Sequence, residues 1–113
     1  MSQRRYKMIV FSYPAEGREE EYNDWYQNFH LNQVVKIRDI QAAQRFRLAR
    51  KLKEGEAHPY AAIYEIETED IDAVLDEIRT AAGTERLSIS GAINTDFTSA
   101  TVYEEFGYIV RKL

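Results

Sequence analysis

The chain has 113 residues, 44% of them hydrophobic and 30% charged, with a net charge of −4 and no cysteine. This length suits one domain with its own core, and the composition is that of a folded globular protein rather than a disordered one. The negative charge disfavours binding to nucleic acid or to an anionic membrane, and the lack of cysteine excludes disulfides, a thiolate nucleophile and sulfur-ligated metals.

The first expected elements are a strand and a helix. Residues 5–13, "RYKMIVFSY", are rich in β-branched and aromatic types, and the strand should end at Pro14. Residues 18–31 follow with the spacing of a helix, and glutamates in the first turn suit the positive end of its dipole. Four aromatic residues recur there at i, i+3, i+4 and i+7: Tyr22, Trp25, Tyr26 and Phe29.

The middle of the chain predicts two antiparallel strands joined by a hairpin. Residues 40–52 contain helix formers and could also be a helix, but Phe46 and Leu48 alternate with arginines, which favours a strand. The turn-like "KEGEAHP" then leads into a second strand over residues 60–67.

The second half predicts one more helix and a last strand. Residues 69–82 carry a single apolar stripe, with Thr68 as the expected N-cap and Gly83 just beyond the end. Residues 84–100 are long for a connection and are expected to form a partly helical lid. Residues 101–111 are expected to be a strand with a bulge or kink at its glycine.

This order, βαββαβ, predicts an α+β ferredoxin-like fold: a four-stranded antiparallel sheet with two helices on one face. The other face would then be bare, and exposed aromatic residues on it would form an association surface. We therefore expect a homodimer that forms through the sheet face. Large side chains fall on both sides of the last strand: Val102, Phe106, Tyr108 and Val110 on one side, Tyr103 and Ile109 on the other.

Three stretches resemble the EthD-type members of the dimeric α+β barrel superfamily: "EGREEEYNDWYQNFHLNQV", "AAQRFRLA" and "YAAIYEIE". The resemblance implies a homodimer whose two sheets form a barrel with the helices outside. It also implies a cleft between sheet and helices in each subunit, lined by His30. Relatives in this superfamily include cyclases, monooxygenases, isomerases and lyases, many without a cofactor. This chain reads "HLNQVVKIRDI" where relatives often read "HLPDVLAVPGV", so it lacks their proline and Pro-Gly turn.

His30 and Tyr26 are the candidate catalytic residues. They are four residues apart on one helix face, and an imidazole among aromatic rings suits general acid–base chemistry. The alternative is a structural histidine that caps the last carbonyls of the helix. A tyrosine on a strand would protonate an enolate, and Phe97 would reach over the opening from the lid. Six residues are candidates for substrate binding: Tyr6, Trp25, Arg45, Tyr60, Tyr64 and Phe97.

Aromatic and cationic candidates each have a structural alternative. Trp25 either forms the apolar wall of a cleft or simply packs in the core. Arg45 and Arg47 either hold a substrate carboxylate or enolate oxygen, or form salt bridges with Glu65 or Glu67 on the neighbouring strand.

Missing motifs narrow the chemistry. No glycine-rich phosphate loop or metal-binding histidine pattern occurs, so we expect no cofactor and no metal. His58, beside Pro59 in the hairpin turn, is expected on the surface.

The sequence favours a cofactor-independent lyase, isomerase or cyclase that acts on an apolar, aromatic or carbonyl-bearing molecule. The alternatives are a cofactor-free monooxygenase, a non-catalytic dimeric ligand-binding protein and a purely structural aromatic scaffold. No signal-peptide pattern is seen, so a cytoplasmic location is expected, with neither nucleic acid nor membrane as partner.

Overall fold

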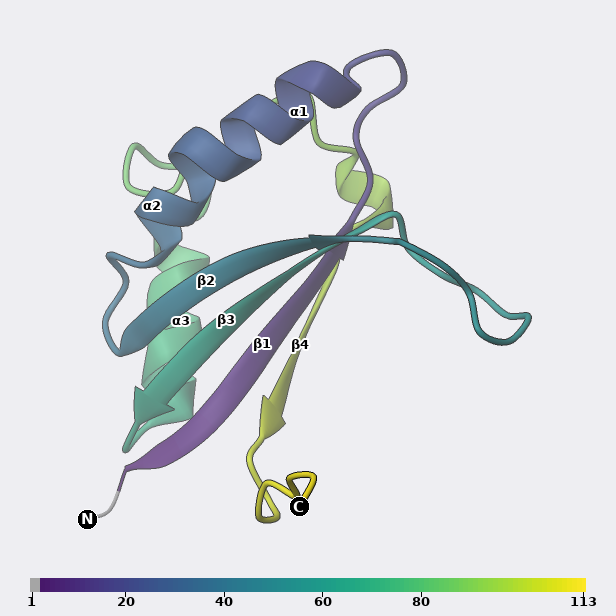
Figure 1. The fold of residues 1–113 in the computed structure, drawn as a ribbon. Coiled ribbons are helices and arrows are strands. Elements are labelled where there is room, and N and C mark those ends of the chain that lie inside the picture. The colour runs from purple at the N-terminus through teal and green to yellow at the C-terminus, as the bar shows by residue number, and fades with distance from the viewer. Residues whose placement is uncertain (1–2) are drawn as a thin grey trace.

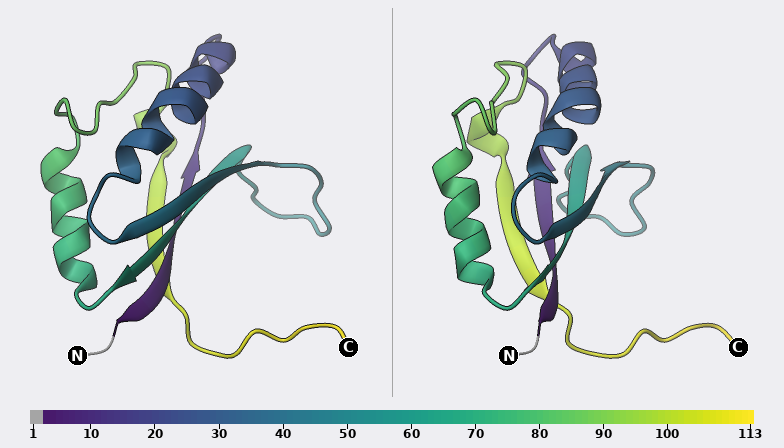
Figure 2. Two further views of the ribbon diagram at one scale, coloured as in Figure 1. Left: turned by 60° about the vertical axis from the view of Figure 1, so that its left-hand side comes forward. Right: turned by 90° about the vertical axis from the view of Figure 1, so that its left-hand side faces the viewer.

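The four strands form one antiparallel sheet in the order β2-β3-β1-β4, and the helices lie on one side of it (Figures 1 and 2). This computed structural model describes residues 3–113. The arrangement confirms the predicted α+β ferredoxin-like fold. In chain order the elements are β1 (Arg4–Ser12), α1 (Glu19–Trp25), the π-helical turn η1 (Tyr26–His30), α2 (Leu31–Val34), β2 (Ile40–Arg47), β3 (Tyr60–Thr68), α3 (Ile71–Ala81), the 3₁₀ turn η2 (Thr95–Phe97) and β4 (Ser99–Glu104).

Alternate residues of the two central strands make the core beneath the helices. The register places Met8 of β1 opposite Tyr64 of β3, and both side chains are buried. Because successive strand residues point to opposite faces, the same face carries every second residue. The buried residues that the two strands contribute are Tyr6, Met8, Ser12, Tyr60, Ala62, Tyr64, Ile66 and Thr68.

The opposite face of the sheet is covered by no helix of the described chain (Figure 2). Ile9 and Ile63, which are paired in register, lie at its centre. Phe46 and Tyr103 lie nearer its edges, with 44% and 59% of their surfaces exposed. The bare sheet face with exposed aromatic residues that the sequence predicts is therefore present, and it also carries charged residues such as Lys7 and Glu65.

The first helix is longer than expected and is not uniform. It continues past residue 31 to Val34, and the five residues Tyr26–His30 form a π-helical turn within it. The N–H of Leu31 donates to the carbonyl of Tyr26, five residues earlier. Such turns are rare and occur mostly as single interruptions of α-helices.

β2 and β4 end earlier than predicted, each close to the end of the strand with which it pairs. β2 stops at Arg47, which pairs with Tyr60, the first residue of β3. β4 stops at Glu104, which pairs with Tyr6, close to the start of β1. One further hydrogen bond, from the N–H of Glu105 to the carbonyl of Arg5 at 2.8 Å, ends the pairing. Residues 105–113 leave the sheet as an irregular segment (Figure 2), and Gly107 lies in this segment rather than in a strand bulge.

The start of α3 also differs from the prediction by two residues. Asp70, not Thr68, is the N-cap, and its carboxylate accepts a hydrogen bond from the N–H of Ala73 at 3.1 Å. The Thr68 hydroxyl instead donates to Asp39 at 2.7 Å. Gly83 follows the helix with a φ of 82°, as expected for a left-handed terminus.

The connection after α3 is fastened to the first half of the chain. Its one helical turn is η2, and the N–H of Asn94 donates to the carbonyl of Tyr13 at 2.9 Å. The side-chain oxygen of Gln33 accepts from the N–H of Ser88 at 3.0 Å.

Among residues 3–113, no helix has the length and apolar character needed to cross a membrane.

Candidate functional site

Four buried tyrosines converge between the first helix and the sheet. Tyr22 and Tyr26 come from the helix, and Tyr60 and Tyr64 from alternate positions of β3. The Tyr22 ring lies 5.5 Å from that of Tyr26 and 5.2 Å from that of Tyr60, measured between centroids. Burial raises the pKa of Tyr22, Tyr26 and Tyr64, so these phenols stay protonated and can donate hydrogen bonds at neutral pH.

Arg45 reaches into this tyrosine cluster from β2. Its guanidinium carbon lies 4.7 Å from the centroid of the Tyr26 ring and 5.4 Å from the centroids of Tyr22 and Tyr60. Its Nη2 donates to the side-chain oxygen of Asn23 at 2.7 Å. Cations over tyrosine faces are attracted by the ring quadrupole. The charge is therefore held by aromatic rings and an amide.

Arg45 has no acidic partner among residues 3–113. The alternative of a salt bridge from Arg45 or Arg47 to Glu65 or Glu67 is wrong. Arg45 lies opposite Ala62, whose side chain faces the helices, and residues 65 and 67 have the opposite parity on β3. Glu65 pairs instead with Lys7, on the uncovered face, at 3.6 Å.

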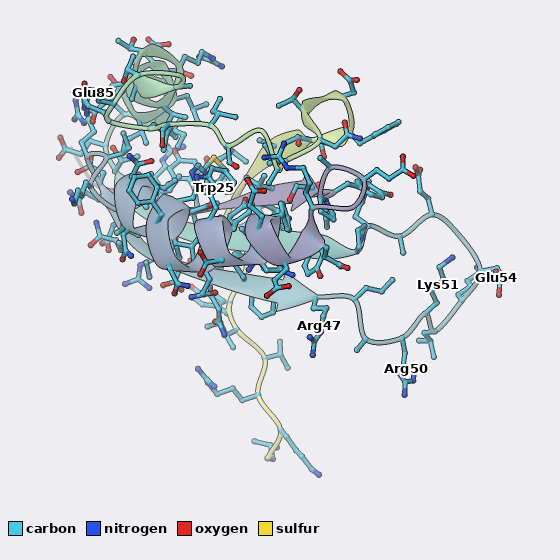
Figure 3. All side chains as sticks on the ribbon, turned by 90° about the horizontal axis from the view of Figure 1, so that it is seen from above. Trp25, Arg47, Arg50, Lys51, Glu54 and Glu85 are labelled. Atoms are coloured by element: carbon cyan, nitrogen blue, oxygen red, sulfur yellow. The ribbon has the colours of Figure 1, made fainter. Side chains whose placement is uncertain are left out.

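A pocket of about 320 Å³ opens beside Arg45, at the β2 edge of the sheet. At its wall the Tyr60 hydroxyl donates to Glu19 at 2.6 Å and accepts from the Asn23 amide at 3.2 Å. Figure 3 shows Arg47 at the end of β2, next to the loop that carries Arg50. Two guanidinium groups at one pocket favour a ligand with an anionic oxygen. The lining residues are Asn23, Arg45, Phe46, Arg47 and Tyr60.

His30 is packed between two aromatic rings. It stacks on Trp25 with a centroid distance of 4.5 Å and an angle of 26°, and it meets the Tyr26 ring edge-on at 4.9 Å. Burial lowers the pKa of His30 to about 4, so the imidazole is neutral at neutral pH. Its Nδ1 is buried and has no hydrogen-bond partner among residues 3–113.

The helical-cap alternative for His30 is also wrong. The helix continues for another turn through Val34, so His30 lies inside it rather than at its end. A buried imidazole nitrogen without a partner is costly in a purely structural role. That nitrogen is therefore an unpaired polar atom inside the protein, and it is not at the wall of the Arg45 pocket.

The π-helical turn explains how Trp25 and His30 meet. Residues five apart are on different sides of an α-helix, where neighbours are three or four apart. In the wider π turn, where hydrogen bonds join residues five apart, positions i and i+5 come together. The turn therefore creates the Trp25–His30 stack.

The structure brings most, but not all, of the predicted site residues close together. Tyr26, Arg45, Tyr60 and Tyr64 share the tyrosine cluster, and Trp25 and His30 adjoin it through Tyr26. The wall of the Arg45 pocket does not include His30.

Tyr6 and Phe97 lie elsewhere. Tyr6 is buried on β1 and borders a separate pocket with Gln41. Phe97 is 62% exposed and lies 5.8 Å from the ring of Tyr13.

Sequence reasoning missed Tyr22 and Asn23. Tyr22 belongs to the helical aromatic stripe, so its spacing indicated only a core residue. No sequence pattern pointed to Asn23, because its hydrogen bond with Arg45 forms only where β2 passes beneath the helix. The surface prediction for His58 is wrong: it is half-buried and stacks on Phe11 at 4.7 Å, because the hairpin loop returns across the end of β1.

No protein-family model matches the chain, and no curated protein matches it by sequence. The crystal structure of an ethyl tert-butyl ether D (EthD) family protein from Bacillus halodurans matches it with a TM-score of 0.60. The match covers 90% of this chain and 99% of that one, at 15% sequence identity. The chain shares its fold with that EthD family protein. The resemblance seen in the sequence is thus confirmed for the fold, while function has to be argued from the site.

Proposed function

We propose that the protein is a cofactor-independent enzyme of the lyase, isomerase or cyclase type. Its substrate is a small molecule with an apolar, aromatic or carbonyl-bearing body and an oxygen that becomes anionic. The observation that carries this proposal is Arg45: a half-buried cation among tyrosine rings, without an acidic partner among residues 3–113, at the wall of a pocket. Preorganised cations of this kind stabilise carboxylates and enolates.

His30 is the proposed general base. It takes a proton from the carbon next to the substrate carbonyl, and the electron pair moves to the carbonyl oxygen, near Arg45. The proton then returns to another carbon in an isomerisation, or to the leaving group in a lyase reaction. Tyr26 contacts both His30 and Arg45 through its ring, and we propose that its hydroxyl hydrogen-bonds the intermediate between them.

The remaining candidates have supporting roles. Tyr60 lines the pocket, and Trp25 supports the imidazole by stacking. Tyr64 is buried on the side of β3 that faces the helices. Tyr6 and Phe97 contact neither Arg45 nor His30 in the described contacts, and they remain predictions from the sequence alone.

A homodimer through the uncovered sheet face belongs to this proposal. Half-exposed aromatic residues such as Phe46 and Tyr103 would be buried between two such sheets. Sedimentation equilibrium at micromolar concentration should give the mass of a dimer. A stable monomer under these conditions would rule out the barrel arrangement.

The proposal is tested with a panel of aromatic carboxylates and 1,3-dicarbonyl compounds. Thermal stabilisation of the wild type identifies ligands, and the same compounds are then assayed for turnover. Arg45→Gln should lose binding, while Arg50→Gln, an exposed arginine on the hairpin loop, is the matched control. His30→Ala should bind the ligand and lose turnover. If no compound of the panel binds near Arg45, the proposal is wrong.

One observation favours a second candidate, a non-catalytic ligand-binding protein. A pKa of about 4 makes His30 a weak base at neutral pH. Binding that depends on Arg45, without turnover by the wild type of any compound, would select this alternative. Oxygen consumption with a bound substrate would instead select the cofactor-free monooxygenase.

A further inference from the structure

We propose that the substrate carries a permanent carboxylate in addition to its reacting oxygen, and that Arg47 binds this carboxylate. The inference rests on the proposed function, in which Arg45 faces the oxygen that becomes anionic. It goes further, because it divides the two arginines of the pocket between two groups of one molecule. The substrate class that follows is a carboxylic acid with a separate ketone group that can form an enolate.

The backbone of β2 holds the two arginines at a fixed separation. Arg45 lies opposite Ala62 and Arg47 lies opposite Tyr60 in the register with β3, so both are on the strand face that is turned toward the helices. Residues two apart in a strand are separated by about 7 Å along its axis. Both arginines line the pocket of about 320 Å³. A ligand in this pocket therefore meets two cationic groups at two separate points.

The two side chains differ in how firmly they are held. Arg45 is half-buried; its Nη2 donates to the side-chain oxygen of Asn23 at 2.7 Å, and its Nη1 donates to the backbone carbonyl of Asn23 at 3.4 Å. Arg47 is exposed and has no ion pair or side-chain hydrogen bond within residues 3–113.

This difference suits two different kinds of oxygen. A fixed and partly desolvated cation such as Arg45 stabilises a charge that develops during the reaction. An exposed guanidinium such as Arg47, without a partner in the described chain, has its planar pair of N–H donors available for a group that is charged from the start. Carboxylates are the groups that such a pair binds with two parallel hydrogen bonds.

The Tyr60 hydroxyl, also at the pocket wall, is not available as a donor. It donates its only proton to Glu19 at 2.6 Å and accepts from the Asn23 amide at 3.2 Å. Its remaining lone pair repels an anionic oxygen. Glu19 forms no ion pair with either arginine in the described part of the chain. The guanidinium groups are thus the cationic donors that the pocket offers to a carboxylate.

The chain that follows Arg47 adds a local positive field. Arg50, Lys51 and Lys53 come before the first acidic residue of the loop, Glu54, and Figure 3 shows this loop continuing from the end of β2. The protein as a whole has a net charge of −4, so the positive region is confined to this end of the molecule. Such a region attracts anions generally, and the experiment has to separate that attraction from a specific contact with Arg47.

The test compares two probes of the same shape, para-acetylbenzoate and its methyl ester, by isothermal titration calorimetry. Both carry the ketone, and only the acid carries a charge. The wild type should bind the acid about tenfold or more tightly than the ester. Arg47→Gln, at an exposed position, should remove this preference by weakening the binding of the acid alone. Arg50→Gln removes the same charge from the exposed loop and should keep the preference.

The outcomes separate this inference from the proposed function. Equal binding of the two probes by the wild type, with both lost in Arg45→Gln, would overturn the inference and leave the proposed function standing. A preference for the acid that persists in Arg47→Gln, or that Arg50→Gln removes equally, would also overturn it. If neither probe binds, the inference is wrong, whereas the proposed function is wrong only when no compound of its panel binds. A preference that depends on Arg47 without any turnover supports the inference and contradicts the enzymatic role.

Discussion

Trp25 and His30 stack nearly parallel although five residues separate them, with ring centroids 4.5 Å apart. The contact exists because the helix passes through a π turn between them. On its other side His30 meets the edge of Tyr26, whose ring face is covered by Arg45. One short helical segment thus links the neutral imidazole to the cation at the pocket.

The first prediction concerns the pH dependence of stability. The pKa of His30 is lowered from 6.5 to about 4 in the folded protein, so the unfolded chain binds the proton more tightly. This contribution to the free energy of unfolding is complete above pH 6.5 and is lost as the pH falls towards 4. Between pH 7 and pH 5 we expect a loss of about 2 kcal/mol. Urea denaturation at the two pH values measures it.

The control for this prediction is His30→Asn, which removes the titrating group. The variant should lose about 2 kcal/mol less than the wild type between pH 7 and pH 5. An equal loss in both proteins would assign the pH dependence to other residues.

The second prediction concerns Arg45. Replacement by Met removes the cation from the tyrosine faces and leaves the side-chain oxygen of Asn23 without its donor. We expect a loss of about 1–2 kcal/mol in the free energy of unfolding. Arg45→Lys keeps the charge but not the planar guanidinium, so it should recover only part of the loss. Guanidinium chloride denaturation compares the variants, and identical stability of all three would contradict the prediction.

The third prediction concerns the buried hydrogen bond between the hydroxyls of Ser12 and Tyr22. Removal of one hydroxyl leaves the other buried without its partner, so Ser12→Ala and Tyr22→Phe should each cost about 1–2 kcal/mol. The double variant should cost clearly less than the sum of the two single ones, because neither hydroxyl then remains. A double-mutant cycle by denaturation measures the coupling. Additive costs would mean that the two hydroxyls are not coupled.

The fourth prediction concerns the N-cap of α3. Asp70→Ala removes the acceptor for the N–H of Ala73 and should destabilise the protein by about 1 kcal/mol. Asp72→Ala, in the same first turn but without a cap bond, is the matched control. If both substitutions cost the same, the effect comes from the helix dipole and not from the cap.

The fold was predictable because its signals are local. Period-two strands and the apolar stripe of α3 each indicate an element without knowledge of the rest, and their order gives the topology. The ends of β2 and β4 were not predictable, because a strand ends where its neighbour ends. Beyond Arg47 and Glu104 each ladder continues for one more backbone hydrogen bond, and the chain then leaves the sheet.

The site was predictable only in part for a related reason. His30 and Tyr26 were proposed from their spacing together with the resemblance to EthD-type proteins, and Arg45 from its strand parity. Their proximity is seen in the structure, while their roles stay predictions. Asn23 binds Arg45 only because two distant segments cross, and no local pattern carries that information. The π turn was invisible as well, since its residues are ordinary helix residues.

The π turn is equivalent to one inserted residue. The buried positions of the helix run Tyr22, Tyr26, Leu31 and Val34, with steps of four, five and three. Gln27 and Asn28, within the turn, are exposed, so the additional residue bulges into solvent while the helix on both sides keeps its contact with the sheet. Deletion of Asn28 would give an α-helix in which Tyr26 and the former Leu31 are one ordinary turn apart. The helix can therefore absorb a change in chain length here without a shift of the core.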